Sequence, residues 1–256
     1  MLSLFFAVTA AAADPLYQWD PKLDTAWTVA TGTTWATLWF GVEPSLGPSI
    51  PHGSAPQGID RVSLGRWSPG VAKASDLALY TALPAAVGLS AWAGHEQGSS
   101  AIPALLVIQS VTTTGAIVDL AKLAVRRPRP FTWTENPSPE IAVATQKTDA
   151  WMSFPSGHTA FVGAVSFSTA EILVHSRGIA PWKAYGTAGL LTAGMGSLRV
   201  FAGKHYPTDV LVGGVIGAAV GLGTVALHEK KTGEASTSLS LGAGASPAML
   251  TVSGEW

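Results

Sequence analysis

The stretch VLVGGVIGAAVGLGTVAL, residues 210–227, carries no charged side chain. It is too long for an ordinary strand and shows no strict alternation of polar and apolar residues, so it predicts a helix. Its length approaches the roughly 20 residues that cross a bilayer. Gly213, Gly217 and Gly221 recur every four positions, a spacing that lets helix backbones approach closely. The stretch therefore predicts a tightly packed helix, which either spans a membrane or lies buried in a soluble all-α protein.

Five further apolar segments precede it and predict helices for the same reasons. They are residues 25–42, 77–94, 101–118, 159–174 and 184–198. The second and third of these also lack charges and approach the length of a membrane span, whereas Glu171 interrupts the fourth. Asp76 and Asp209 stand just before two of the six segments, where we expect N-caps or first-turn acids. The sequence thus predicts an all-α, six-helix bundle embedded in a membrane.

The composition is also typical of a membrane-embedded protein. Only 12% of the 256 residues are charged while 47% are apolar, and the mean hydropathy is +0.31. Soluble proteins average about 25% charged residues. The net charge of −1 gives no sign of nucleic-acid binding through bulk electrostatics. Cysteine is absent from the sequence, which excludes disulfides, thiolate catalysis and cysteine-based zinc sites.

The two ends of the chain and two long connections differ from the helical segments. Residues 1–14, MLSLFFAVTAAAAD, resemble the end of a secretory signal peptide, although a positively charged start is missing. Residues 43–75 are rich in proline, glycine and serine, and residues 131–153 contain TENPSPE, so both predict loops. From residue 232 onward, two alternating runs predict a β-hairpin or a loosely ordered tail.

Cations and histidines gather in three short motifs, and the first is KLAVRRPRP, residues 122–130. Its prolines end the third predicted helix and leave an arginine-rich turn at an apolar boundary. A guanidinium binds phosphate through two parallel hydrogen bonds, while an ammonium contributes a point charge. Lys122 and Arg129 are our candidates for such binding. Arg126 and Arg127 better suit a basic helix cap or an anchor for lipid head groups.

The second motif is PSGH, residues 155–158, at the start of the fourth predicted helix. Ser156 and the N–H groups of Gly157 and His158 would point into a helix N-terminus, which favours anions. Gly157 lets the backbone come close to a ligand. His158 can give a proton to a departing oxygen. The alternative is an ordinary serine N-cap with an incidental histidine.

The third motif, RVFAGKHYPTD, spans residues 199–209 at the junction of the last two predicted helices. His205 lies four residues before Asp209. A carboxylate that holds one imidazole nitrogen leaves the other free and more nucleophilic. The alternative is a surface histidine beside a capping aspartate. A metal site is disfavoured, because no HExxH pattern occurs and the acid near His205 is better used as its orienting partner.

These three motifs resemble those of the type 2 phosphatidic acid phosphatase and vanadium haloperoxidase superfamily, in its bacterial phosphatase branch. The family pattern is Lys-x6-Arg-Pro, then Pro-Ser-Gly-His, then Ser-Arg-x5-His-x3-Asp. Residues 122–130 and 155–158 match the first two parts completely. The third part departs only at Leu198, where the family has serine. The resemblance covers roughly residues 76–227.

The resemblance implies a helical-bundle core, hydrolysis without a metal or other cofactor, and a phosphohistidine intermediate. It makes His205 the nucleophile, Asp209 its orienting partner and His158 the acid for the leaving group. Five groups would bind the phosphate oxygens, namely those of Lys122, Arg129, Ser156, Gly157 and Arg199. The chain would then consist of a signal peptide (1–14), an N-terminal helix and loop (15–75), a phosphatase core (76–231) and a C-terminal tail (232–256).

The leading hypothesis is a metal-free phosphatase that acts on a lipid monophosphate or diphosphate. Apolar helices motivate this substrate, because an amphiphile could reach a site at the membrane surface. Two alternatives stay open: a soluble exported acid phosphatase of broad specificity, and a vanadium-dependent haloperoxidase in which the same groups bind vanadate. The expected partners are a phosphoester substrate and a membrane, without nucleic acid.

The expected location is a bacterial cell membrane with the site on the periplasmic face, and the alternative is a soluble periplasmic protein. Basic residues favour cytoplasmic loops. Arg177 and Lys183 lie in the loop before the fifth segment, and Lys230 and Lys231 follow the sixth segment. This loop and this tail are therefore predicted on the cytoplasmic side, and the three motifs on the outer side. If all six segments span, the N-terminus is cytoplasmic too, which conflicts with a cleaved signal peptide.

Overall fold

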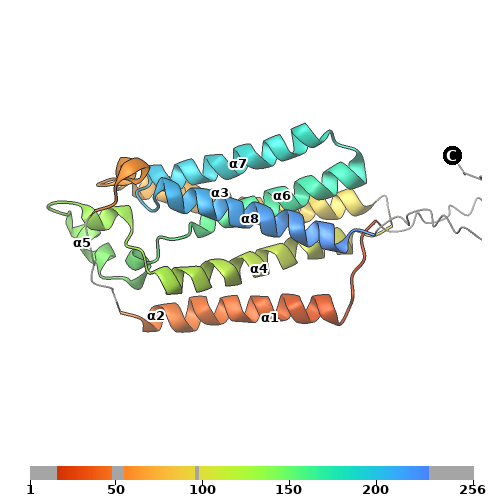
Figure 1. The fold of residues 1–256 in the computed structure, drawn as a ribbon, viewed down its shortest axis with the longest axis horizontal. Helices are drawn as coiled ribbons and strands as arrows, with labels where there is room; N and C mark the ends of the chain where they lie inside the picture. Colours follow the sequence, from red (N-terminus) through yellow and green to blue (C-terminus); the bar gives the residue numbers. More distant parts are fainter. Residues whose placement is uncertain (1–15, 48–54, 96–97, 231–256) are drawn as a thin grey trace, which may run out of the picture.

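The computed structural model describes residues 16–47, 55–95 and 98–230, in which six long helices form a bundle along one axis (Figure 1). They are α1 (Leu23–Thr37), α3 (Pro69–His95), α4 (Ala101–Val125), α6 (Gly157–Arg177), α7 (Pro181–Phe201) and α8 (Pro207–His228). The predicted all-α class and all six helical segments are confirmed. β-structure among the described residues is limited to one isolated bridge, between Tyr17 and Glu229. The predicted signal peptide and C-terminal tail lie outside the described residues.

The start of α3 differs from the prediction. The helix begins at Pro69, two turns before the apolar segment at residue 77. Proline suits a first helical turn, because the N–H that it lacks has no partner there. Asp76 therefore lies inside α3, and the prediction that it caps or begins a helix is wrong. Asp209 does lie in the first turn of α8, as predicted.

Both predicted loops contain helical turns. α1 continues into a π-helical turn, η1 (Leu38–Val42), and then α2 (Glu43–Ser45), and the 3₁₀ helix η2 (Gly58–Ser63) follows. Between α4 and α6 lie η3 (Pro130–Trp133), α5 (Pro139–Thr145) and η4 (Thr148–Trp151). In Figure 1, α2, α5 and the residues around η2 gather at one end of the bundle, called here the α5 end.

α6 lies at the centre of the bundle and packs against α3, α4, α7 and α8. Its contact with α8 is close, because a Cβ on Gly217 would lie 2.0 Å from the carbonyl oxygen of Ala160. A Cβ on Gly213 would likewise lie 2.5 Å from the carbonyl oxygen of Ser156. The predicted glycine spacing therefore does bring two helix backbones together. It also holds the start of α6 against the start of α8, where two of the three motifs lie.

α1 lies along α4 at the edge of the bundle (Figure 1). Gly115 makes room for the indole of Trp35, since a Cβ there would lie 2.4 Å from the ring. Thr31 and Thr112 share a hydrogen bond of 2.9 Å between their hydroxyl groups. The contact between these two helices is therefore partly polar, although the helix surfaces are mostly apolar.

Three helices are long and apolar enough to cross a membrane. They are α3, α4 together with the residues up to Trp133, and α8, with mean hydropathies of 1.3, 1.7 and 2.2. Large apolar side chains stand exposed on them, for example Leu77, Tyr80, Leu211 and Val215, each at least 61% exposed. Extended apolar surfaces of this kind mark contacts with lipid or with another protein. The described helices thus favour the membrane-embedded bundle over the soluble one.

Candidate active site

The three motifs meet at the α5 end of the bundle. α4 ends there, α6 begins there, and the connection from α7 to α8 crosses there (Figure 1). This is the arrangement that alternating helix directions predict for the three motifs. The candidate site therefore lies between helix ends, next to the short helices of the two long connections.

Lys122 lies in the last turn of α4 and is nearly buried. Its Nζ lies 3.0 Å from Oδ1 of Asp119, one turn earlier, and 5.2 Å from the ring centre of Trp39. A Cβ on Gly157 would lie 3.5 Å from the same Nζ. The ammonium therefore lies beside the first residue of α6, where free backbone N–H groups already favour an anion.

The guanidinium of Arg129 lies at the centre of the candidate site. Its Nη1 lies 3.0 Å from Nε2 of His205 and donates to the carbonyl oxygen of Lys204 at 2.9 Å. Its Nη2 donates to Oδ1 of Asp149 at 2.5 Å, and its Nε donates to the carbonyl oxygen of the same residue at 2.7 Å. The side chain is thus held in place from two sides, by η4 and by the α7–α8 connection.

His205 is 1% exposed and makes a hydrogen bond through each ring nitrogen. Arginine can only donate, so the Nε2 that faces Arg129 is the unprotonated nitrogen. Nδ1 then carries the proton and donates it to the carbonyl oxygen of Ser153 at 2.6 Å. Burial lowers the pKa of His205 well below its usual value of 6.5, and the charges of Arg129 and Arg199 lower it further. The imidazole is therefore neutral near pH 7, with a lone pair on Nε2.

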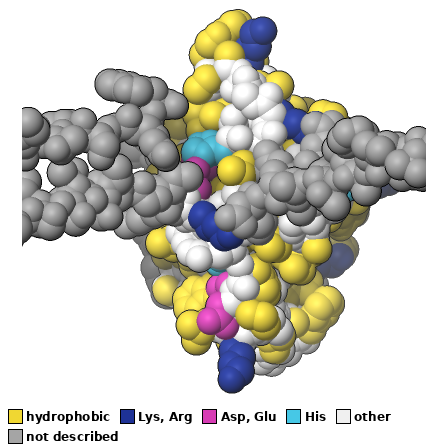
Figure 2. Space-filling model, turned by 90° about the vertical axis from the view of Figure 1, so that its right-hand side faces the viewer, with side chains coloured by type: hydrophobic (Ala, Val, Ile, Leu, Met, Phe, Trp, Pro, Cys, Tyr) yellow, Lys and Arg dark blue, Asp and Glu magenta, His cyan; other side chains and the backbone are white. Residues whose placement is uncertain are grey.

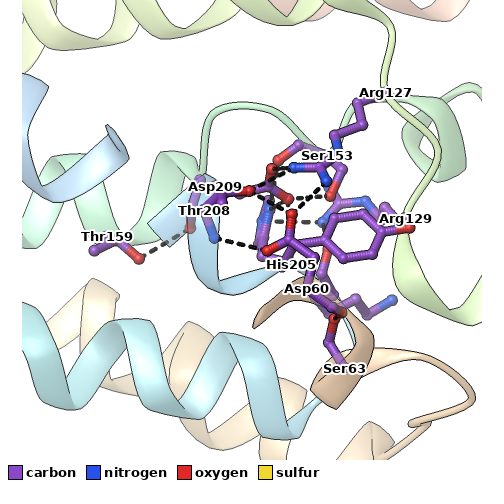
Figure 3. A network of polar contacts seen from close by, with 12 residues as sticks. Asp60, Ser63, Arg127, Arg129, Ser153, Thr159, His205, Thr208 and Asp209 are labelled. Carbon is purple, nitrogen blue, oxygen red and sulfur yellow. Dashed lines mark hydrogen bonds and ion pairs between the residues drawn. The ribbon is translucent and has the colours of Figure 1, made fainter. Parts of the chain in front are cut away.

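Asp209 and His205 lie close together in a dense polar network (Figure 3). Its Oδ2 accepts from Ser153 Oγ at 2.6 Å and from the backbone N–H of Tyr206 at 2.9 Å. Oδ2 also lies 3.7 Å from Nδ1 of His205, which is longer than a hydrogen bond. The carboxylate is therefore linked to the imidazole largely through Ser153, whose hydroxyl donates to Asp209 and whose carbonyl oxygen accepts a hydrogen bond from Nδ1.

Arg127 belongs to this network, in contrast to the predicted cap or head-group anchor. Its guanidinium bonds to Asp209 at 2.5 Å and to Asp60 at 2.7 Å, and it lies 4.0 Å above the ring of Tyr206. Asp60 also accepts from the backbone and the hydroxyl of Thr208 (Figure 3). Burial alone would raise the pKa of Asp60, but the bonds from Arg127 and Thr208 outweigh it and lower the pKa. Arg126 does cap α4, with φ of 46° and a bond to the carbonyl oxygen of Gly47.

Ser156 and His158 begin α6 beside a carboxylate that the motifs do not contain. The hydroxyl of Ser156 lies 2.9 Å from that of Thr159, and its backbone N–H donates to the carbonyl oxygen of Asp209. Nε2 of His158 lies 2.8 Å from Oδ1 of Asp76. Arg199, 5% exposed, reaches the same oxygen at 3.2 Å. Sequence reasoning missed Asp76 in this place, because it took the acid for a helix cap.

Lys204 and Ser153 are two further residues of the site that sequence reasoning missed. Nζ of Lys204 lies 4.7 Å from the ring centre of Trp67 and 5.0 Å from that of Phe131. Burial and the nearby charge of Arg129 lower the pKa of Lys204 to about 8. Lys204 directly precedes His205 and Ser153 precedes the second motif by two residues, but no spacing rule singled them out.

The structure therefore brings together all eight residues chosen from the sequence, namely Lys122, Arg129, Ser156, Gly157, His158, Arg199, His205 and Asp209. The arrangement joins three cations, a helix N-terminus and an imidazole whose unprotonated Nε2 faces a guanidinium. Such groups can bind a phosphoryl group and attack its phosphorus atom. Within the part of the chain that the structure describes, no cluster of three or more His, Asp or Glu side chains could hold a metal ion.

Two kinds of curated proteins resemble part of the chain. A lipid A 1-phosphatase of Rhizobium johnstonii is 34% identical over 110 residues, which is 43% of this chain and 41% of that protein. A decaprenylphosphoryl-5-phosphoribose phosphatase of Mycobacterium tuberculosis is 37% identical over 106 residues, which is 41% of this chain and 50% of that protein. The matched region thus spans about half the length of each curated relative or less.

A solved structure and a family model extend the likeness to the fold. The crystal structure of a transmembrane PAP2-type phosphatidylglycerolphosphate phosphatase from Bacillus subtilis matches 80% of this chain and 94% of its own, with a TM-score of 0.50. At 18% identity this match concerns the fold, which is that of a membrane protein. The model of the PAP2 superfamily matches residues 103–233, just over half of the chain, and this range contains all three motifs. With motifs, helix order and family model in agreement, the chain belongs to the PAP2 superfamily.

Proposed function

We propose that this protein is a membrane phosphatase that hydrolyses a lipid monophosphate or diphosphate through a phosphohistidine on His205. The observation that carries the proposal is the position of His205, whose unprotonated Nε2 lies 3.0 Å from the guanidinium of Arg129. The names of the relatives, a lipid A 1-phosphatase and a decaprenylphosphoryl-5-phosphoribose phosphatase, support a phosphorylated lipid as the substrate.

The phosphate would bind between the cations and the start of α6. Lys122 supplies a point charge beside Gly157, and Arg129 and Arg199 supply guanidinium donors. The Ser156 hydroxyl and the Gly157 N–H would bind the remaining oxygens. Because all three cations are nearly buried, their interaction with a bound anion is stronger than it would be in water. The proposed site thus stabilises charge on the phosphoryl oxygens during transfer.

The reaction needs two displacements at phosphorus. The lone pair of His205 Nε2 forms a bond to phosphorus while the bond to the leaving oxygen breaks, and that oxygen takes a proton from His158. Water then attacks the phosphohistidine, its proton passes to His158, and the N–P bond electrons return to Nε2. The products are an alcohol, or a monophosphate from a diphosphate, and inorganic phosphate. Asp209 and Ser153 keep Nδ1 of His205 protonated and the ring in position.

A direct assay tests this function. The detergent-purified protein should release phosphate from phosphatidic acid and from a soluble phosphomonoester, with EDTA present and without added metal. Loss of activity in EDTA would overturn the metal-free mechanism. His205→Ala should remove the activity, whereas His95→Ala, at the other end of the bundle, should retain it. Substantial turnover by His205→Ala would refute the nucleophile.

Vanadate separates the phosphatase from the haloperoxidase. It should inhibit a phosphatase, because its trigonal-bipyramidal form occupies the same cations as the transferring phosphoryl group. Oxidation of bromide by the vanadate-treated protein and hydrogen peroxide would instead identify a haloperoxidase.

We further propose that the α5 end faces the periplasm of a bacterium. Arg177 and Lys183 lie at the opposite end, where Figure 2 shows basic side chains among hydrophobic ones, and basic residues favour the cytoplasmic side. Because the sequence has no cysteine, single cysteines report sidedness without background. A membrane-impermeant maleimide on intact spheroplasts should label Lys147→Cys and spare Lys183→Cys. The reverse pattern would overturn this orientation.

A further inference from the structure

One carboxylate oxygen is shared by two residues of the candidate site. Oδ1 of Asp76 lies 2.8 Å from Nε2 of His158 and 3.2 Å from Nη1 of Arg199. We infer that Asp76 is a positioning residue that couples phosphate binding at Arg199 to the protonation of His158. The inference rests on the proposed function, since it assigns His158 the role of general acid.

The orientation of His158 follows from the chemistry of its partner. An ionised carboxylate can only accept hydrogen bonds, so Nε2 of His158 carries a proton and donates it to Asp76. Nδ1 is then the nitrogen that gains and loses the second proton. A carboxylate on one side of an imidazole stabilises the charged form and holds the ring for proton transfer on the other side. His158 and Asp76 thus form a second histidine–carboxylate pair, separate from His205 and Asp209.

Arg199 has hydrogen-bonding capacity left over for an anion. Its Nη1 donates to the hydroxyl of Ser75 at 2.8 Å as well as to Asp76. The side chain is only 5% exposed, and its Nε is buried without a hydrogen-bond partner. A buried charged donor without a partner is costly, so a phosphate oxygen that reached it would bind favourably. Phosphate and Asp76 therefore compete for the positive charge of Arg199.

Charged and titratable groups from several elements surround His158. The charged ones are Asp76 of α3, Lys122 of α4, Arg129 after α4 and Arg199 of α7, and the neutral, titratable His205 lies before α8. In the free protein burial and then the charges of Arg199 and Arg129 oppose a positive charge on His158, and Asp76 favours it. A phosphate dianion offsets the cations and draws Arg199 away from Asp76, which leaves the carboxylate to His158. His158 then takes a proton from solvent when substrate is bound.

This proton has a defined path through the reaction. It moves from Nδ1 of His158 to the oxygen that leaves phosphorus, as that oxygen takes the electron pair of the broken P–O bond. The water that hydrolyses the phosphohistidine returns a proton to the same nitrogen. No oxidant, reductant or further reactant is needed. The general acid is thus charged while phosphate occupies the site and neutral when it is empty.

The test compares two substrates that differ in their need for an acid. Phosphatidic acid releases an alkoxide, which needs a proton, whereas p-nitrophenyl phosphate releases a phenolate that leaves without one. Asp76→Asn keeps the shape but removes the charge, so kcat for phosphatidic acid should fall about 100-fold. The kcat for p-nitrophenyl phosphate should fall less than about threefold on the same grounds. The basic limb of the kcat profile for phosphatidic acid should also move to lower pH.

A matched control removes a carboxylate that is bonded to a different cation of the site. Asp149 bonds to Arg129 and not to His158. Asp149→Asn should change kcat for both substrates by the same factor and leave the basic limb of the pH profile in place. Asp76→Glu restores the charge. It should return the ratio of kcat for phosphatidic acid to kcat for p-nitrophenyl phosphate to within about threefold of the wild-type ratio.

Three outcomes would overturn the inference. Asp76→Asn could slow both substrates equally while it unfolds at the same temperature as the wild type, or it could leave both rates unchanged. Asp76→Glu could fail to restore the ratio although it folds. A wild-type protein that releases phosphate from neither substrate would overturn the proposed function as well, so the two failures can be told apart.

Discussion

The two ends of the bundle use histidine in opposite surroundings. At the α5 end, His205 turns an unprotonated Nε2 toward Arg129, and its pKa is low because the ring is buried among cations. At the other end, His175 lies between two carboxylates, with Nε2 3.4 Å from Glu171 and Nδ1 bonded to Glu229. A guanidinium beside the ring can only donate a hydrogen bond, so it fixes Nε2 of His205 as the unprotonated nitrogen, whereas the carboxylates beside His175 can only accept. The neighbours, more than the residue type, distinguish the proposed nucleophile from a histidine that joins two helix ends.

The end opposite the site holds the ends of the described chain together. His228, at the end of α8, lies 3.0 Å from Asp24 at the start of α1. Tyr17 pairs with Glu229 in the isolated bridge, and the backbone N–H of Lys230 donates to the carbonyl oxygen of Leu16. The polar contacts at this end therefore join segments that are distant in sequence. At the α5 end, comparable contacts position the side chains of the candidate site around His205 and Arg129.

The largest expected effect comes from exchanging the two histidines for glutamine. His205→Gln should lower phosphatase activity by about 10³-fold or more, because it removes the nitrogen that we propose attacks phosphorus. His175→Gln should retain activity within about twofold, because it removes only an ion pair far from the site. Phosphate release under saturating substrate measures both. Comparable losses of activity in the two variants would contradict the assignment of the catalytic role to the α5 end alone.

A smaller effect is expected on stability. Arg127→Leu leaves Asp209 and Asp60 without their shared cation, and a buried charge that loses its partner costs about 3 kcal/mol. Asp24→Asn at the other end replaces an ion pair with a neutral hydrogen bond to His228, which should cost about 1 kcal/mol or less. Denaturant unfolding in one detergent compares the two. A larger loss of unfolding free energy in Asp24→Asn than in Arg127→Leu would show that the ion pairs at the α5 end do not contribute more to stability than the pair at the opposite end.

The smallest effect is a dependence of stability on pH. The pKa of His205 in the folded protein lies well below its unfolded value of about 6.5. Below that pH, the unfolded chain binds a proton that folded His205 does not, so stability falls as the pH drops. The loss is at most about 1.4 kcal/mol for each pH unit below 6.5. Unfolding midpoints at pH 7.5 and 5.5 should therefore differ less in His205→Gln than in the wild type, and an equal difference would contradict the assigned cause.

Helices and motifs were predictable because their signals are local. A run of apolar residues without charge predicts a helix wherever it packs, and the spacing of Gly213 and Gly217 predicts a close contact without naming the partner. The start of α3 was missed, because polar residues between Pro69 and Asp76 interrupt the apolar pattern and hide two helical turns. The short helices in the long connections were missed for the same reason.

The sequence by itself determined the fold class, the family and the eight residues that gather at the α5 end. These follow from patterns along the chain, since helix directions alternate and the motifs fall at matching helix ends. Only the tertiary structure decided which charge faces which imidazole. Arg127 bonds to Asp209, the carbonyl oxygen of Ser153 accepts a hydrogen bond from Nδ1 of His205, and Asp76 bonds to His158 from a distant helix. Such pairings depend on distances of a few ångströms between segments that are far apart in sequence, and no periodicity along one chain encodes them.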